Sequence, residues 1–223
     1  MTQPLPTQAM PRADRGPVGL YAITPDIAEP AVLLPRIEQA LAGGIDALQF
    51  RVKRDPHTDP FRSAAALRDL AAKIKQLCDA RGIPLIINDD VELACEIEAR
   101  GVHVGRDDGD PKTIRERLGP ARWLGVSCYN DLNRALALQP WADHVGFGSL
   151  FASSTKPAAV RAPLSLFAQA REAGLHAVGI GGIDRTNAAS VIAAGAHAVA
   201  IINDLFGDPD PAQAARALRR EIG

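Results

Sequence analysis

Short runs of apolar residues alternate along this chain with segments of helical periodicity. Each run is four to seven residues long and almost continuous in apolar side chains, a pattern typical of parallel strands that are buried on both faces. Because parallel strands need a crossover between them, the intervening segments are expected to be helices. The runs predict eight strands, at residues 18–24, 45–50, 83–87, 101–104, 123–127, 143–148, 176–180 and 197–202.

The segments between these runs carry apolar residues three and four positions apart, which is the spacing of one face of an α-helix. The clearest covers residues 67–78, and Gly82 follows it as a stop signal. We expect Asp184 to cap the seventh helix, and Asp210 with Pro211 to begin the last one. One helix is predicted after each of the eight strands.

Eight strand–helix units between residues 18 and 223 predict an α/β domain of the (β/α)₈, or TIM, barrel type. An open, doubly wound sheet is the alternative, but "AITPD" follows the first strand in place of a GxGxxG motif. Residues 1–17 carry four prolines and no periodic pattern, so we interpret them as a flexible N-terminal arm. In a barrel, the functional residues are expected at the carboxyl ends of the strands.

Charge and hydropathy argue against two classes of partner. The 25 basic and 26 acidic residues give a formal net charge of −1, so no overall field draws the chain to nucleic acid or to an anionic membrane. No apolar run is long enough to span a membrane, and the first residues lack the apolar core of a secretory signal. A cytoplasmic protein that acts on small molecules is therefore expected.

The cysteines and histidines show no metal-binding pattern. Cys78, Cys95 and Cys128 are odd in number and lack CxxC spacing, which argues against a disulfide framework or a zinc site. His103 is expected to be an interior residue of its strand, and the other four histidines are scattered without ligand spacing. The sequence shows no Ser/His/Asp arrangement that would indicate nucleophilic hydrolysis.

The second strand ends in polar residues at a spacing of two, within the stretch "LQFRVKR". Alternation places Gln49, Arg51 and Lys53 on one face, which in a barrel points inward near the mouth. A planar guanidinium beside a compact ammonium suits a di- or polyphosphate. The alternative is an ordinary solvated strand end.

Carboxylates follow the next two strands. Asn88, Asp89 and Asp90 end the third strand, while Asp107 and Asp108 come just after the fourth. Carboxylates at neighbouring strand ends can share Mg²⁺, which typically takes one or two of them together with substrate phosphate oxygens. Helix capping is the competing interpretation, and we expect it for Asp90.

Two later regions have the composition of anion-binding loops. The loop "GFGSLFASSTKP" contains Ser153, Ser154, Thr155 and Lys156, whose hydroxyls, backbone amides and ammonium suit an anion, although ordinary loop composition is an alternative. The segments "GIGGID" and "INDLFG" follow the last two strands, where many barrels bind phosphate. A second anion site is therefore predicted.

Taken in order, these motifs resemble the thiamine-phosphate synthase family, also called thiamine-phosphate pyrophosphorylase. The resemblance covers nearly the whole domain and depends on the order and spacing of the motifs. It implies a transferase that joins 4-amino-2-methyl-5-(diphosphooxymethyl)pyrimidine to a thiazole phosphate with Mg²⁺, giving thiamine monophosphate and diphosphate. The motifs are "LYAITPD", "LQFRVK", "IPLIINDD", "GVHVGRDD", "LGVSCYND", "FGSLFASSTKP", "GIGGI" and "AVAII".

The resemblance also implies roles for individual residues. Asp89 and Asp108 match the magnesium ligands. Arg51, Lys53, Ser127 and Lys156 are implied to act in catalysis. The pyrimidine diphosphate would be bound by Gln49, Phe50, Arg51, Val52, Lys53, Asn88, Ser127 and Lys156, and the thiazole phosphate by Ser153, Ser154, Thr155, Gly182, Ile202 and Asn203.

The implied chemistry is dissociative: diphosphate leaves first, and the thiazole nitrogen captures the pyrimidine methylene cation without a covalent enzyme group. Several positions depart from the family pattern, among them "SSTK", which replaces a Thr-rich run although Ser153 keeps a hydroxyl. Arg106 stands where the family usually has Gln, which adds a cation near Asp108. Tyr129 stands where His is common, and Asn203 replaces a common Ser but keeps a hydrogen-bond donor.

Three other functions remain as alternatives. A thiazole tautomerase, a related barrel, would bind only the thiazole phosphate and would have little use for the diphosphate and metal residues. A Schiff-base aldolase would use Lys53 or Lys156 as its amine. A non-catalytic barrel would bind a thiamine precursor without releasing diphosphate. Association into a homo-oligomer is left open by one sequence.

Overall fold

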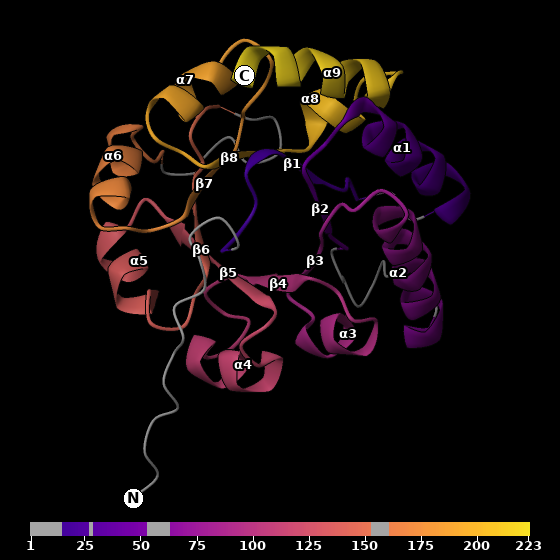
Figure 1. Ribbon diagram of the computed structural model, residues 1–223, viewed down its shortest axis with the longest axis horizontal. Helices are drawn as coiled ribbons and strands as arrows, with labels where there is room; N and C mark the ends of the chain where they lie inside the picture. The colour runs from indigo at the N-terminus through magenta and orange to yellow at the C-terminus, as the bar shows by residue number, and fades with distance from the viewer. Residues whose placement is uncertain (1–14, 27–28, 53–62, 153–160) are drawn as a thin grey trace, which may run out of the picture.

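Eight parallel strands close into a barrel in the computed structural model of this protein, and helices surround them (Figure 1). The structure describes residues 15–26, 29–52, 63–152 and 161–223. The predicted (β/α)₈ barrel is thereby confirmed, and the open sheet is wrong, because β8 pairs with β1. The strands are β1 Gly19–Ile23, β2 Ala47–Phe50, β3 Leu85–Asn88, β4 Gly101–Val104, β5 Trp123–Tyr129, β6 His144–Phe147, β7 Ala177–Ile180 and β8 Ala198–Ile201.

One helix follows each of the first seven strands in the described part of the chain, but two follow β8. The additional helix is the four-residue α8, which is too short to show helical periodicity in the sequence. The helices are α1 Pro30–Gly43, α2 Ala64–Asp79, α3 Val91–Glu96, α4 Pro111–Leu118, α5 Leu132–Leu138, α6 Ser165–Glu172, α7 Ala188–Ala193, α8 Asn203–Phe206 and α9 Pro211–Ile222.

Side-chain caps fix where several helices begin. Asp90 accepts a hydrogen bond from the backbone N–H of Leu93, which confirms the predicted cap of α3. Asp210 caps α9 as predicted, with Pro211 as its first residue. The predicted cap Asp184 is wrong: its carboxylate bonds Thr186 in a local turn, and α7 begins later, at Ala188.

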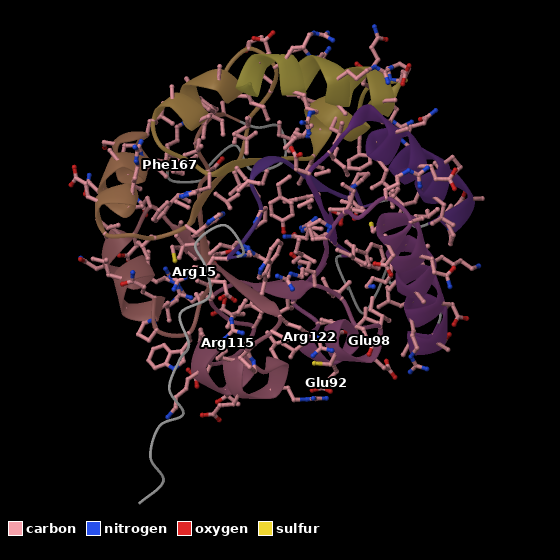
Figure 2. All side chains as sticks on the ribbon, in the orientation of Figure 1. Arg15, Glu92, Glu98, Arg115, Arg122 and Phe167 are labelled. Carbon is pink, nitrogen blue, oxygen red and sulfur yellow. The ribbon has the colours of Figure 1, made fainter. Side chains whose placement is uncertain are left out.

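Strand alternation separates two apolar regions. Residues facing outward, among them Leu48, Phe50 and Phe147, form the large core between the strands and the helices. Phe147 of β6 meets Phe167 of α6 edge to face at 5.8 Å, and Figure 2 labels Phe167 on that helix. Inward-facing residues, such as Tyr21 and Ile86, form a smaller cluster inside the barrel. The inner cluster supports the floor beneath the carboxyl-terminal mouth.

The amino-terminal end of the barrel is covered by residues 15–17. The His176 ring nitrogen Nε2 donates to the Pro17 carbonyl at 2.7 Å, and a Cβ on Gly16 would lie 2.8 Å from the Cβ of His144. These residues belong to the segment interpreted as an arm, and the division at residue 17 stays a prediction. Across the described residues, no helix is long and apolar enough to cross a membrane.

All three cysteines are free thiols. Burial raises the pKa of both Cys78 and Cys128 to about 12, so both are protonated at neutral pH. Both are structural residues of the core between the strands and the helices.

Candidate active site

Four adjacent strands, β2 to β5, carry predicted site residues to the carboxyl-terminal mouth of the barrel. Arg51 follows β2, Asp89 follows β3 and Asp108 follows β4, while Ser127 lies near the end of β5. Because these strands are neighbours, side chains that are far apart in the sequence converge on one side of the mouth. This is the arrangement that barrel enzymes use for their active sites.

The backbone of Arg51 is fixed to the end of β1. The Thr24 hydroxyl accepts from the Arg51 N–H at 2.9 Å and donates to its carbonyl at 3.2 Å. The guanidinium Nη1 lies 3.0 Å from Oδ1 of Asp26. Thr24 and Asp26 were not predicted as site residues. Their position at the carboxyl end of the first strand could have indicated that they lie at the mouth.

The remaining residues of the β2 motif lie at different depths. Gln49 faces inward and is 3% exposed, and its Nε2 donates to the Tyr21 hydroxyl at 2.7 Å. Phe50 and Val52 belong to the helix-facing core, as alternation from Gln49 requires. Of the described residues in this motif, Arg51 is therefore the one whose charged side chain lies at the mouth.

Asp89 and Asp108 form a pair of neighbouring carboxyl groups. Partial burial, followed by the hydrogen bond and negative charge of Asp108, raises the pKa of Asp89 to about 6. Asn88 Nδ2 donates to Asp89 Oδ2 at 2.5 Å, and the backbone N–H of Gly105 donates to Asp108 Oδ2 at 2.6 Å. Two carboxylates that repel one another beside Arg51 make a site that favours a cation.

The backbone of Asp89 has an uncommon conformation. Its φ is +62°, in the left-handed region that non-glycine residues rarely adopt, and its N–H donates to the His103 carbonyl at 2.9 Å. Strained residues of this kind cluster at functional sites. The conformation turns the chain between β3 and the capping residue Asp90.

Ser127 is joined to two histidines, of which His103 is partly buried and His144 is fully buried. His103 Nε2 lies 3.0 Å from the Ser127 hydroxyl, and His103 Nδ1 lies 3.5 Å from His144 Nε2. Gly125 lies between the two rings in the sheet register and leaves room for them. Burial lowers the pKa of His103 to about 4 and that of His144 well below its usual value, so both rings are neutral at pH 7. The predicted interior role of His103 is confirmed.

The loops after β6, β7 and β8 are held against one another. Gly182 has a φ of +67°, and a Cβ there would lie 2.6 Å from the Ala152 carbonyl oxygen. Arg185, in the loop after β7, forms an ion pair with Asp204 at 3.1 Å. This ion pair is formed beside Asn203, which begins α8 after Ile202. The predicted residues Gly182, Ile202 and Asn203 therefore follow two adjacent strands.

Several predicted site residues lie outside the described part of the chain. They are Lys53, Ser153, Ser154, Thr155 and Lys156. Their roles stay predictions. Residues 151 and 152 directly precede Ser153 and lie against Gly182. The described chain therefore enters this loop beside a residue predicted to bind the thiazole phosphate.

A separate charged groove lies on the helical exterior between α3 and α4. It is lined by Glu92, Cys95, Glu96, Arg117 and Arg122, and none of these residues was predicted for the site. Figure 2 labels Glu92 and Arg122 at this edge of the molecule. Glu92 forms an exposed ion pair with Arg117, so the groove has the properties of a solvated surface.

Comparison with known proteins relates the chain to one family. A family model described as thiamine monophosphate synthase matches residues 20–205. Thiamine-phosphate synthase from Aromatoleum aromaticum is 48% identical over 203 residues, covering 90% of this chain and 94% of the relative. The enzyme of that name from Methylobacillus flagellatus is 51% identical over 195 residues, with coverages of 86% and 89%.

Solved structures agree with the sequence matches. Thiamine phosphate pyrophosphorylase from Pyrococcus furiosus superposes with a TM-score of 0.79 at 28% identity, covering 93% of this chain and 96% of that one. A 3-hexulose-6-phosphate synthase matches with a TM-score of 0.69 at 19% identity, which supports the barrel fold alone.

Proposed function

Because this chain belongs to the thiamine-phosphate synthase family, transferases of thiamine biosynthesis, we propose that its barrel mouth joins a pyrimidine diphosphate to a thiazole phosphate. The products would be thiamine monophosphate and diphosphate. The observation that carries the proposal is the convergence of Arg51, Asp89, Asp108 and Ser127 from four adjacent strands. A thiazole tautomerase, which handles no diphosphate, would have little use for this set.

Arg51 is the described cation best placed to receive the diphosphate. Its planar guanidinium can donate two parallel hydrogen bonds to phosphate oxygens, and its backbone is fixed by Thr24. Lys53 and Lys156 would add charge by the family resemblance. Ser127 would donate a hydrogen bond from its hydroxyl to the substrate. Its neighbour His103 is neutral and can donate to the Ser127 oxygen, which leaves the serine proton for the substrate.

Asp89 and Asp108 fit a magnesium ion. Partial burial and the neighbouring carboxyl group of Asp108 raise the pKa of Asp89, and a divalent cation would relieve the repulsion between the two carboxylates. Within the described residues no cluster of three or more His, Cys, Asp or Glu side chains is placed to hold a metal. The remaining ligands would therefore come from substrate phosphate and water, which is the usual arrangement for Mg²⁺. Bound there, the ion would supply positive charge to the leaving diphosphate.

The thiazole phosphate would lie across the mouth, where the loops after β7 and β8 meet. Gly182 lets the backbone approach residues 151 and 152 closely, and Asn203 can donate from its side-chain amide. The hydroxyls of Ser153, Ser154 and Thr155 would complete this phosphate site. The two phosphorylated substrates would then face one another inside one mouth.

The reaction needs positioning and charge stabilisation. The bond between the pyrimidine methylene carbon and the diphosphate oxygen breaks with its electron pair on diphosphate, and the carbon then bonds the thiazole nitrogen. Arg51 would stabilise the negative charge that forms on the leaving group. Buried Gln49, beneath the mouth, would act through Tyr21 to hold the floor of the site.

We expect the enzyme to act in the cytoplasm on small molecules, and its oligomeric state is open.

The direct test uses the purified full chain with hydroxymethylpyrimidine diphosphate, thiazole phosphate and Mg²⁺. Released diphosphate and thiamine monophosphate are measured in parallel, with each substrate omitted in turn. The Arg51→Gln variant should lose most activity, whereas Arg68→Gln should not. Arg68→Gln is a matched control because it removes a guanidinium of α2 that forms an exposed ion pair with Glu96 of α3.

Other outcomes identify the alternatives. Equal amounts of diphosphate and joined product that require all three components support the synthase. A folded protein that binds both substrates without product overturns the proposal. Isomerised thiazole phosphate alone would indicate a tautomerase, and borohydride trapping of a carbonyl substrate on lysine would indicate an aldolase.

A further inference from the structure

The backbone of β5 directs Tyr129 out of the regular strand alternation. The pairing of β5 with β6 shifts register between Ser127 and Tyr129, and Tyr129 has a φ of +56°. A bulge at the end of a barrel strand commonly re-aims a side chain, and a positive φ is strained for a tyrosine. Tyr129 is 41% exposed, so no burial of its ring accounts for that strain. The position therefore has the properties of a functional one.

Arg106, directly after β4, stacks on this tyrosine. Its guanidinium carbon lies 5.0 Å from the centre of the Tyr129 ring. Asp107 and Asp108 are its neighbours in sequence, yet no carboxylate in the described part of the chain forms an ion pair with Arg106. Stacking on an aromatic face leaves the N–H groups at the edge of a guanidinium able to bind an anion.

The pair lies beside the carboxylate Asp108. A Cβ on Gly105 would be 2.8 Å from Asp108 Oδ2 and 3.9 Å from the Tyr129 hydroxyl, so both groups converge on this glycine. The Gly105 N–H also donates to Asp108. Arg106 is therefore a cation held next to the place where the diphosphate and its metal are proposed to bind.

We propose that Arg106, positioned by the ring of Tyr129, is a further residue that binds the diphosphate of the pyrimidine substrate. The inference rests on the proposed function for the identity of that substrate. Arg106 would approach the diphosphate from the end of β4 and Arg51 from the end of β2, the two strands that flank β3. Two guanidinium groups would then enclose the leaving group, and Tyr129 would limit the conformations that Arg106 must lose on binding.

Three variants test this arrangement. Arg106→Gln removes the charge and keeps a polar side chain, Tyr129→Leu removes the aromatic ring, and Tyr129→Phe keeps it. Binding of inorganic diphosphate in Mg²⁺ is measured by calorimetry, and the KM for each substrate is measured with kcat. We expect Arg106→Gln to weaken diphosphate binding and raise the pyrimidine KM by about tenfold, the effect of losing one charge-assisted hydrogen bond. The thiazole KM should stay within about twofold.

The tyrosine variants separate positioning from structure. Tyr129→Leu should raise the pyrimidine KM by about two- to fivefold with little change in kcat, because Arg106 keeps its charge but loses its support. Tyr129→Phe should restore wild-type values. A matched control is Arg100→Gln, which removes a guanidinium lying 4.7 Å from the Trp123 ring at the start of β5 and should leave both constants unchanged.

The results distinguish failure of the inference from failure of the proposed function. If the wild type forms product and Arg106→Gln binds diphosphate equally well, Arg106 is not a diphosphate residue. If Arg106→Gln changes the two KM values equally, its effect is on the whole mouth and the inference is also wrong. If the wild type forms no product, the proposed function fails, while the calorimetric comparison still shows whether Arg106 binds diphosphate.

Discussion

The guanidinium Nη1 of Arg51 lies 3.0 Å from one carboxylate oxygen of Asp26 and 3.1 Å from the other. The pair joins the loop after β1 to the loop after β2 at the mouth of the barrel. The same guanidinium is the proposed anchor for the substrate diphosphate. A bound diphosphate and Asp26 would therefore compete for Arg51.

Asp26→Asn should bind inorganic diphosphate more tightly, by about 3- to 10-fold, because a competing negative charge is removed from Arg51. The pair is partly exposed, so the free energy of unfolding should change by less than about 1 kcal/mol. Calorimetry and urea unfolding measure the two effects, and Asp26→Glu, which keeps the charge, serves as the control. Weaker diphosphate binding in Asp26→Asn would show that Asp26 orients Arg51 for the substrate.

Asp108→Asn should lower Mg²⁺-dependent turnover by about 100-fold or more and raise the Mg²⁺ concentration needed for half-maximal rate. The asparagine oxygen can still accept from the Gly105 N–H, so the loop should keep its shape. Asp107→Asn changes the charge equally at the neighbouring position and should stay within about twofold of the wild type. Equal losses in the two variants would mean that general loop charge, and no specific ligand at Asp108, supports activity.

Gly182→Ala should destabilise the protein and raise the KM for the thiazole phosphate. Gly82 offers a matched control, because both glycines have a φ of +67° but a Cβ on Gly82 would meet nothing within 4 Å. Each alanine should cost about 1–2 kcal/mol of unfolding free energy through backbone strain. The Gly182 variant should lose more, because its Cβ would clash with the Ala152 carbonyl. Equal losses in urea unfolding would contradict the close approach of these two loops.

Acidification should destabilise the barrel through its buried histidines. Burial, together with smaller effects of nearby His197 and Arg15, lowers the pKa of His176 to about 4 despite its hydrogen bond to Pro17. The unfolded chain, with a histidine pKa of about 6.5, therefore takes up protons first, and stability falls as the pH drops from about 6.5 toward 4. His176 alone should cost about 1.4 kcal/mol between pH 7.5 and 5.5.

The measurement is the difference in unfolding free energy between wild type and His176→Gln at several pH values, since the other titrating groups cancel in that difference. Glutamine can still donate to the Pro17 carbonyl, which keeps the packing contact comparable. The advantage of the wild type should shrink as the pH falls. A difference that stays constant from pH 7.5 to 5.5 would rule out the neutral buried imidazole as the cause.

The sequence predicted the barrel because its strands are continuous apolar runs and its helices carry a regular apolar face. It also placed Arg51 on the inward face at the end of β2 and put Asp89 and Asp108 after neighbouring strands, since these positions follow from alternation and strand order. These features depend on backbone periodicity alone. They need no knowledge of side-chain conformation.

The features that were missed depend on local geometry. The stacking of Arg106 on Tyr129 requires a bulge and a left-handed residue that no periodic pattern predicts. His103 and His144 are 41 residues apart in the sequence. Their rings meet because the strand between them carries Gly125 at this level, which has no side chain to keep them apart. The hydrogen bonds that Arg51 donates to Asp26 likewise depend on the conformations of two loops.

Closure of the barrel requires the first strand to pair with the last. β1 pairs on one side with β2 but on the other only with β8, and Arg36 of α1 donates to the carbonyl of Asp208 beyond α8. During synthesis, one edge of β1 therefore stays unpaired until almost the whole chain has left the ribosome. Contacts over so long a separation are slow to form, and an open strand edge invites pairing with other chains. A nascent chain stalled before β8 should thus be a substrate for chaperones, although seven of its eight strands are already complete.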